Sequence, residues 1–79
     1  MESKLTFCYD RVGDILYINR CPPYREQESE DAGDEIVVRL NPNTREVENV
    51  EILFFSRRFL TGESLELPLF ADLRLAVGA

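Results

Sequence analysis

The chain has no histidine, no tryptophan and, in 79 residues, only two cysteines. Without histidine, a serine or cysteine nucleophile lacks its usual general base. Cys8 and Cys21 alone fall short of the four Cys or His ligands of a structural zinc site. No GxxxxGK[ST] or GxGxxG phosphate-binding loop is present. The sequence therefore predicts no cofactor, no metal and no catalytic residue.

Positive charge and long apolar runs are also scarce. Nine basic residues against fifteen acidic ones give a formal net charge of −6 and a pI of about 4.5. This disfavours nucleic acid and anionic membranes, which proteins bind by neutralising negative charge with Lys and Arg. No apolar run approaches the ~18 residues that span a bilayer, and Met1-Glu2-Ser3-Lys4 does not begin a secretory leader. We expect a cytoplasmic protein with reduced cysteines, a disulfide being the alternative.

Short alternating segments dominate the first two thirds of the chain. Alternation of apolar and polar residues, or enrichment in β-branched and aromatic ones, predicts strands over 5–9, 15–19, 35–40 and 46–52. A five-residue link makes the first two an antiparallel hairpin. The alternation of the last segment slips between Val47 and Val50, so we expect a β-bulge near Glu48-Asn49.

Residues 25–34 differ from their neighbours in having no apolar period. Six carboxylates lie between Glu26 and Glu35. Because runs of like charge are usually solvated, this stretch is predicted to be a mobile acidic loop. The alternative is that it docks a basic protein.

The segment 53–60 is rich in aromatic residues and arginine. On a helix, Phe55 and Phe59 share one side, while Phe54, Arg57 and Arg58 share another. We therefore predict one short helix here. The competing interpretation extends the preceding strand through Phe54 or Phe55.

Residues 63–79 form an apolar C-terminal extension. Leu65, Leu67 and Leu69 alternate in phase, which predicts strands broken by Pro68; a helix is the alternative. So many large apolar side chains need cover, either from the chain's own sheet or from a second subunit.

The predicted fold is thus a single α+β domain over residues 1–79. It is a small antiparallel β-sheet meander of four to five strands, with one short helix after the fourth strand. The side chains expected in the core are Leu5, Phe7, Leu16, Ile18, Ile36, Val38, Leu40, Val50, Ile52, Phe55 and Phe59.

Two stretches resemble a known family. Tyr9-Asp10 followed by Gly13-Asp14-Ile15-Leu16-Tyr17-Ile18 is similar to the opening motif of the small bacterial proteins grouped as domain of unknown function 2283. The run Val47-Glu48-Asn49-Val50-Glu51-Ile52-Leu53 is similar to the closing motif of that family. The resemblance covers roughly Phe7 to Phe59, and the turn Asn41-Pro42-Asn43-Thr44 and the long C-terminal extension depart from it. It implies a small antiparallel sheet with a helix, no established activity, and relatives that look like the smaller partner of toxin–antitoxin modules.

Two groups of residues are candidates for function. Asp10 and Asp14 lie in one turn and could hold a hard cation or act as acid and base, but capping of the turn by their carboxylates is the simpler interpretation. Aromatic and arginine residues are enriched at the centres of interfaces. We therefore expect an interface formed by Phe54, Arg57, Arg58, Leu69 and Phe70. The alternative is that the C-terminal strands cover Phe54 while the arginines face water.

The function predicted from these patterns is that of a non-catalytic protein-interaction module that self-associates, as a homodimer. One alternative is an antitoxin-like partner of a basic protein in a two-gene module. Another is a small metal- or thiol-dependent enzyme, using Asp14 or Cys21.

Overall fold

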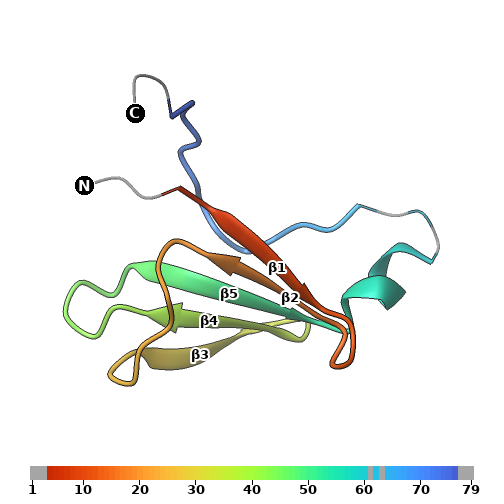
Figure 1. The fold of residues 1–79 in the computed structure, drawn as a ribbon, viewed down its shortest axis with the longest axis horizontal. Helices are drawn as coiled ribbons and strands as arrows, with labels where there is room; N and C mark the ends of the chain where they lie inside the picture. The colour runs from red at the N-terminus through yellow and green to blue at the C-terminus, as the bar shows by residue number, and fades with distance from the viewer. Residues whose placement is uncertain (1–3, 61, 63, 77–79) are drawn as a thin grey trace.

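The computed structural model describes residues 4–60, 62 and 64–76. Within them the chain forms one antiparallel sheet and a single 3₁₀ turn, η1 (Phe55–Phe59) (Figure 1). The strands are β1 (Thr6–Asp10), β2 (Ile15–Asn19), β3 (Glu28–Gly33), β4 (Ile36–Leu40) and β5 (Val47–Leu53). Four of the five coincide with predicted strands to within a residue. The described chain is mostly β, so the antiparallel sheet is confirmed and the α+β class is not.

The order of the strands across the sheet is β1-β2-β5-β4-β3. The expected meander would keep neighbours in chain order, so that prediction is wrong. β3, β4 and β5 do follow one another by short turns, but β5 returns to lie beside β2, which makes β2–β5 a Greek key. The reason is that a meander would leave β5 as an edge, whereas Val50 and Ile52 are buried between β2 and β4.

β3 lies inside the stretch that was predicted to be an acidic loop. Its sequence, ESEDAG, has no apolar alternation and few residues with strand propensity. It pairs with β4 over Glu28–Gly33, interrupted by a bulge at Ala32. The pairing, not the side chains of the segment itself, makes it a strand.

The predicted bulge in the last strand is confirmed. Arg39 pairs with Asn49 and the next residue, Leu40, pairs with Val47, so Glu48 is the additional residue of β5. The extra residue keeps Val47 on the same face as Val50 and brings both against the core.

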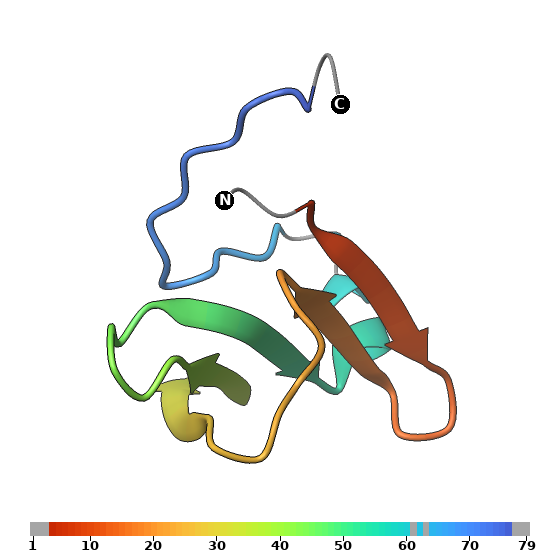
Figure 2. The same cartoon turned by 60° about the vertical axis from the view of Figure 1, so that its left-hand side comes forward.

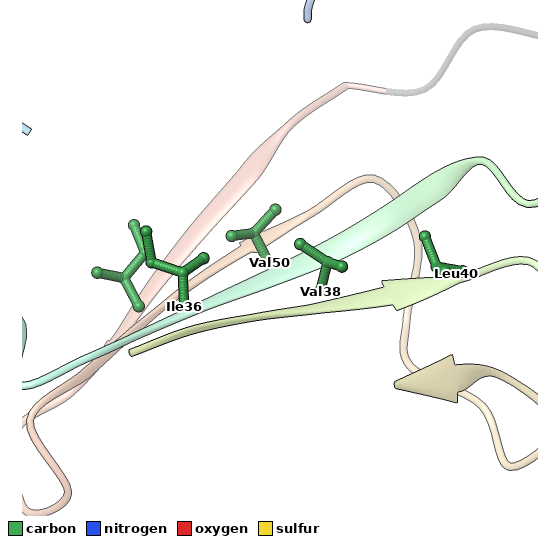
Figure 3. Packing of buried hydrophobic residues seen from close by; sticks show 5 residues of the cluster. Ile36, Val38, Leu40 and Val50 are labelled. Atoms are coloured by element: carbon green, nitrogen blue, oxygen red, sulfur yellow. The ribbon is translucent and has the colours of Figure 1, made fainter. Parts of the chain in front are cut away.

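The core lies on one face of the sheet. The fully buried apolar side chains are Ile36, Val38, Leu40, Val50 and Ile52, and those labelled in Figure 3 all point to the same side of β4 and β5. Leu16, Ile18 and Phe55 pack against them as predicted. Leu5, Phe7 and Phe59 do not, and they are 43%, 62% and 43% exposed. β1 carries the core pattern, but its Leu5 and Phe7 lie outside the core cluster of the described residues.

The predicted helix is replaced by the five-residue turn η1, which follows the fifth strand because β3 adds a strand upstream. Phe54 precedes it in the left-handed region, with φ 53°, and offers no side-chain cap. An uncapped segment this short gains too few hydrogen bonds to sustain an α-helix. Within the described ranges no helix is long and apolar enough to cross a membrane.

The C-terminal extension is not the pair of strands that we predicted. Residues 64–76 form no ladder among the described residues. Leu65, Leu67 and Leu69 do alternate with exposed residues, and they pack against the core without pairing with a strand of the sheet. Figure 2 shows residues 65–69 lying over one face while 70–76 rise away from it. Residues 63 and 77–79 of the extension lie outside the described part.

Candidate functional site

Asp14 joins two segments that are far apart in the sequence. It ends the β1–β2 turn with φ 56°, and its carboxylate accepts hydrogen bonds from Ser56 N at 2.9 Å and Ser56 Oγ at 2.8 Å. The hydroxyl of Tyr9 donates to the same carboxylate at 2.6 Å. The pKa of Asp14 is held below its ordinary value, chiefly by the hydrogen bond from Tyr9 and then by the one from the Ser56 backbone. The hydrogen bond between Tyr9 and Asp14 also raises the pKa of Tyr9.

Asp10 does not converge with Asp14 on a common point. Its carboxylate accepts from the backbone N–H groups of Val12 and Gly13 at 3.0 and 3.2 Å, within its own turn. For Asp10 this is the turn-capping interpretation, whereas Asp14 accepts instead from the Tyr9 hydroxyl and from Ser56. Among the described residues no three Cys, Asp or Glu side chains gather as a metal site.

Arg58 is directed into the molecule. Its guanidinium donates to the backbone oxygens of Leu53, Asp34 and Glu35, and it pairs with the Asp34 carboxylate at 3.2 Å. Only 13% of the side chain is exposed. The β3–β4 turn that it holds has positive φ at both Asp34 and Glu35. Arg58 therefore fastens this turn to η1, and its place in an interface stays a prediction.

Phe54 and Arg57 do lie at the surface. The Arg57 guanidinium stacks over the Phe54 ring, 5.2 Å from its centre, and Phe54 is 45% exposed. The two residues, with Asp34, Glu35 and Arg58, line an open hollow of about 320 Å³. No described residue of the extension lines this hollow, so the described residues do not support the alternative in which C-terminal strands cover Phe54.

The other predicted interface residues belong to the extension. Leu69 packs against the core and is half-buried. Phe70 is fully exposed, and Leu73 and Leu75 are 76% and 83% exposed. The structure thus brings Phe54 and Arg57 together, directs Arg58 inward, and leaves Phe70 on a separate part of the surface.

A polar network around Glu48 and Asn49 was missed by the sequence analysis. The Asn49 side chain is buried; it donates to Asn19 Oδ1 and Cys21 O at 2.8 and 2.7 Å and accepts from Gln27 at 2.6 Å. Gln27 also donates to Glu48. The network holds the β2–β3 connection against the face of the sheet opposite to the core. The phase slip at Glu48-Asn49 was the only sequence feature that marked it.

The phenol of Tyr24 belongs to the same network. Its hydroxyl donates to Glu48 Oε1 at 2.6 Å. This bond raises the pKa of Tyr24 to about 12 and is the largest cause of the lowered pKa of Glu48. Every buried polar side-chain atom in the described residues has a partner, so the network has the satisfied bonding of a structural element.

The acidic segment is partly neutralised within the chain. Arg45 donates to Glu28 at 2.8 Å and to Glu30 at 3.0 Å. The basic partner expected for this segment stays a prediction. Cys8 and Cys21 are free thiols, and burial raises the pKa of the Cys21 thiol, the direction that opposes thiolate formation.

An apolar row on β1 is only partly covered by the described residues. The ring of Tyr9 contacts that of Phe55, with the ring centroids 5.8 Å apart. Leu5, Phe7 and Tyr9 alternate along one side of the strand and are 43%, 62% and 43% exposed. Their neighbours across the ladder are Ile18 and Leu16, which belong to the core face. The row therefore continues the core face beyond the part that the C-terminal extension covers (Figure 2).

Comparison with known proteins gives one match. The family model described as Protein of unknown function (DUF2283) matches residues 7–56, which span both hairpin motifs and end in η1. No curated protein and no solved structure matches the chain significantly.

Proposed function

The chain belongs to the DUF2283 family, as its two motifs indicated, and we propose that it is a non-catalytic interaction module that associates with a second copy of itself. The observation that carries this proposal is the partly exposed apolar row Leu5, Phe7 and Tyr9, which we call the β1 row. Exposed apolar surface that continues a core face is typical of an interaction site. The exposed Phe70, Leu73 and Leu75 of the extension add to the apolar surface that a second copy would cover.

A second copy is the partner that this surface fits. The β1 row carries no charge, so a second copy of the same row does not repel it electrostatically. A self-complementary patch can form a two-fold symmetric dimer without further components. Each residue of the row contributes to such a dimer twice, once from each subunit. The proposed function therefore needs no ligand and no reactive group.

Sedimentation velocity over a range of concentrations up to the high micromolar tests the proposal. We expect the weight-average mass to rise towards that of a dimer. Phe7→Thr, which keeps a residue of high strand propensity, is expected to raise the dimer Kd by about tenfold or more, since two aromatic side chains lose burial. Val12→Thr is the matched control, because Val12 is fully exposed in the β1–β2 turn.

A monomer at every concentration, with the wild-type chain folded, would refute self-association. If Phe7→Thr and Val12→Thr change the dimer Kd equally, the β1 row is not part of the interface. Urea unfolding of both variants shows whether either one acts by destabilising the subunit.

A further inference from the structure

The two edges of the sheet are built differently. β3 at one edge is interrupted by the bulge at Ala32 and carries Glu28, Glu30 and Asp31. Charges and bulges are the features that keep an edge strand from pairing with another chain. β3 is therefore protected.

β1 at the other edge has no bulge, and its one charged residue is Asp10 at the end of the strand. Thr6–Asp10 contains no proline, lysine or arginine, and its ladder with β2 is uninterrupted over five residues. All of its residues are exposed except Asp10, which is half-buried. β1 is the outermost strand on its side of the sheet (Figure 1). The N–H and C=O groups on its outer side therefore have no neighbouring strand in the described sheet. An edge of this kind is a template for a further strand.

We propose that β1 pairs antiparallel with β1 of a second copy, so that two sheets join edge to edge into one. This inference rests on the self-association proposed above and specifies the surface that performs it. The bulged, acidic β3 edge stays outside the interface. The apolar rows of the two copies become one continuous surface.

The register of the pairing follows from symmetry. Residues directly opposite in an antiparallel pair point to the same face. If both β1 rows are to lie on one face, the two-fold axis is perpendicular to the sheet and passes through a residue position. The middle of Thr6–Asp10 is Cys8. Cys8 then opposes Cys8 of the second copy, and Phe7 opposes Tyr9.

The side chains suit this register. Phe7 and Tyr9 form two aromatic cross-strand pairs, a favourable combination in antiparallel sheets. Asp10 opposes the neutral Thr6, so no like charges meet within the strand. The pairing is short, and its area falls below the ~800 Å² per partner of a standard interface. We therefore expect a weak dimer, with a Kd in the micromolar range.

Oxidative cross-linking tests the register with the native thiol. Cys21→Ser leaves Cys8 as the single cysteine. Opposed residues of an antiparallel pair have Cα atoms about 4.5–5.5 Å apart, within the range that a disulfide spans. The matched control is Thr6→Cys in a chain that also carries Cys8→Ser and Cys21→Ser. Thr6 is exposed on the same face of β1, but it lies two residues from the axis, roughly 13 Å from its own copy.

Both single-cysteine chains are treated with diamide, which accepts two electrons and two protons as two thiols become one disulfide. The products are followed on non-reducing gels, and sedimentation velocity is measured on the reduced samples. We expect the Cys8 chain to cross-link at least about tenfold faster than the Thr6→Cys chain. Equal rates, or a faster rate for the control, in samples that sediment as dimers would overturn the β1 pairing and leave self-association standing. Monomers in both reduced samples would overturn both proposals.

Discussion

Ser56 donates two hydrogen bonds to the carboxylate of Asp14, which lies 42 positions earlier in the chain. The backbone N–H of Phe55 also donates to the Asp14 carbonyl, at 3.0 Å. One residue of the opening motif thus positions the start of η1. The opening motif is therefore coupled to η1, which follows the closing motif, and the role of Asp14 is to hold two turns together.

Acid is expected to weaken this connection. The pKa of Asp14 is lowered, chiefly by the Tyr9 hydroxyl, from an ordinary value of 3.8. A group with a lowered pKa in the folded state contributes stability above its unfolded pKa, and this is lost as the pH falls through the folded pKa. The free energy of unfolding should decline below about pH 4. Asp14→Asn, which tolerates the positive φ, should be less stable at neutral pH and decline less in acid. Urea unfolding across this pH range measures both, and parallel curves would contradict the prediction.

Alkali should reveal the Tyr24–Glu48 bond. The pKa of Tyr24 is raised to about 12 because its hydroxyl donates to Glu48. A raised pKa contributes stability that is present below the unfolded pKa of 10 and lost as the pH rises through the folded one. Ultraviolet titration of the folded chain should show a phenolate transition near pH 12 that is absent from Tyr24→Phe. Glu48→Gln should move that transition to lower pH. If all tyrosines of the folded wild-type chain ionise well below pH 12, the predicted effect of the Tyr24–Glu48 hydrogen bond is wrong.

Arg57 and Arg58 are neighbours that should respond differently to substitution. Arg58→Ala removes charge-assisted hydrogen bonds to the β3–β4 turn and should lower the free energy of unfolding by about 1.5–3 kcal/mol. Arg57→Ala removes a stacking contact with Phe54 at the surface and should cost no more than about 0.5–1 kcal/mol. Urea unfolding compares the two. Equal losses would show that Arg58 is not the residue that holds the turn.

Asn49 should be among the most sensitive polar positions of the chain. Asn49→Ala removes the bonds that Asn19, Cys21 and Gln27 make to this side chain and should cost about 1–3 kcal/mol, the penalty of buried groups left unpaired. Asn43→Ala is the control, because Asn43 is exposed and takes part in the turn through its backbone N–H. It should change stability by less than about 0.5 kcal/mol. Thermal and urea unfolding together would establish the difference.

The two halves of the extension should also differ. Leu67 packs against the core, whereas Leu73 is 76% exposed. Leu67→Ala should destabilise the subunit by about 1–2 kcal/mol, less than the loss at a fully buried leucine. Leu73→Ala should leave the stability of the subunit unchanged. A similar loss at both positions would mean that residues 70–76 are also packed in the folded chain.

Strand position was predictable where side chains alternate. β2 and β4 are covered from end to end by the patterns of 15–19 and 35–40, and the slip at Glu48 was enough to predict the bulge in β5. β3 was not predictable from its own residues, because an acidic edge strand takes its conformation from β4 and has no face to bury. The order of the strands could not be predicted either, because alternation indicates which face of a strand is apolar but not which other strand pairs with it.

The candidate site was predicted only in part. Phe54 and Arg57 are at the surface and in contact, as a cluster of aromatic and basic residues suggests. Arg58 has the same local sequence environment, and only the position of the β3–β4 turn decides that it points inward. Leu5 and Phe7 of the β1 row were predicted to be core residues, because alternation marks an apolar face without revealing that the covering segment ends short of it.

The place of β5 in the sheet has a consequence for how the molecule forms. β5 is the last strand in the chain, yet it lies between β2 and β4. The N-terminal hairpin and the β3–β4 hairpin therefore have no common neighbour until residues 47–53 have left the ribosome. Closing so long a loop before any cross-sheet contact forms slows folding. Completion of the sheet should thus wait for residues 47–53, and two exposed hairpin edges would be accessible to chaperones in the interval.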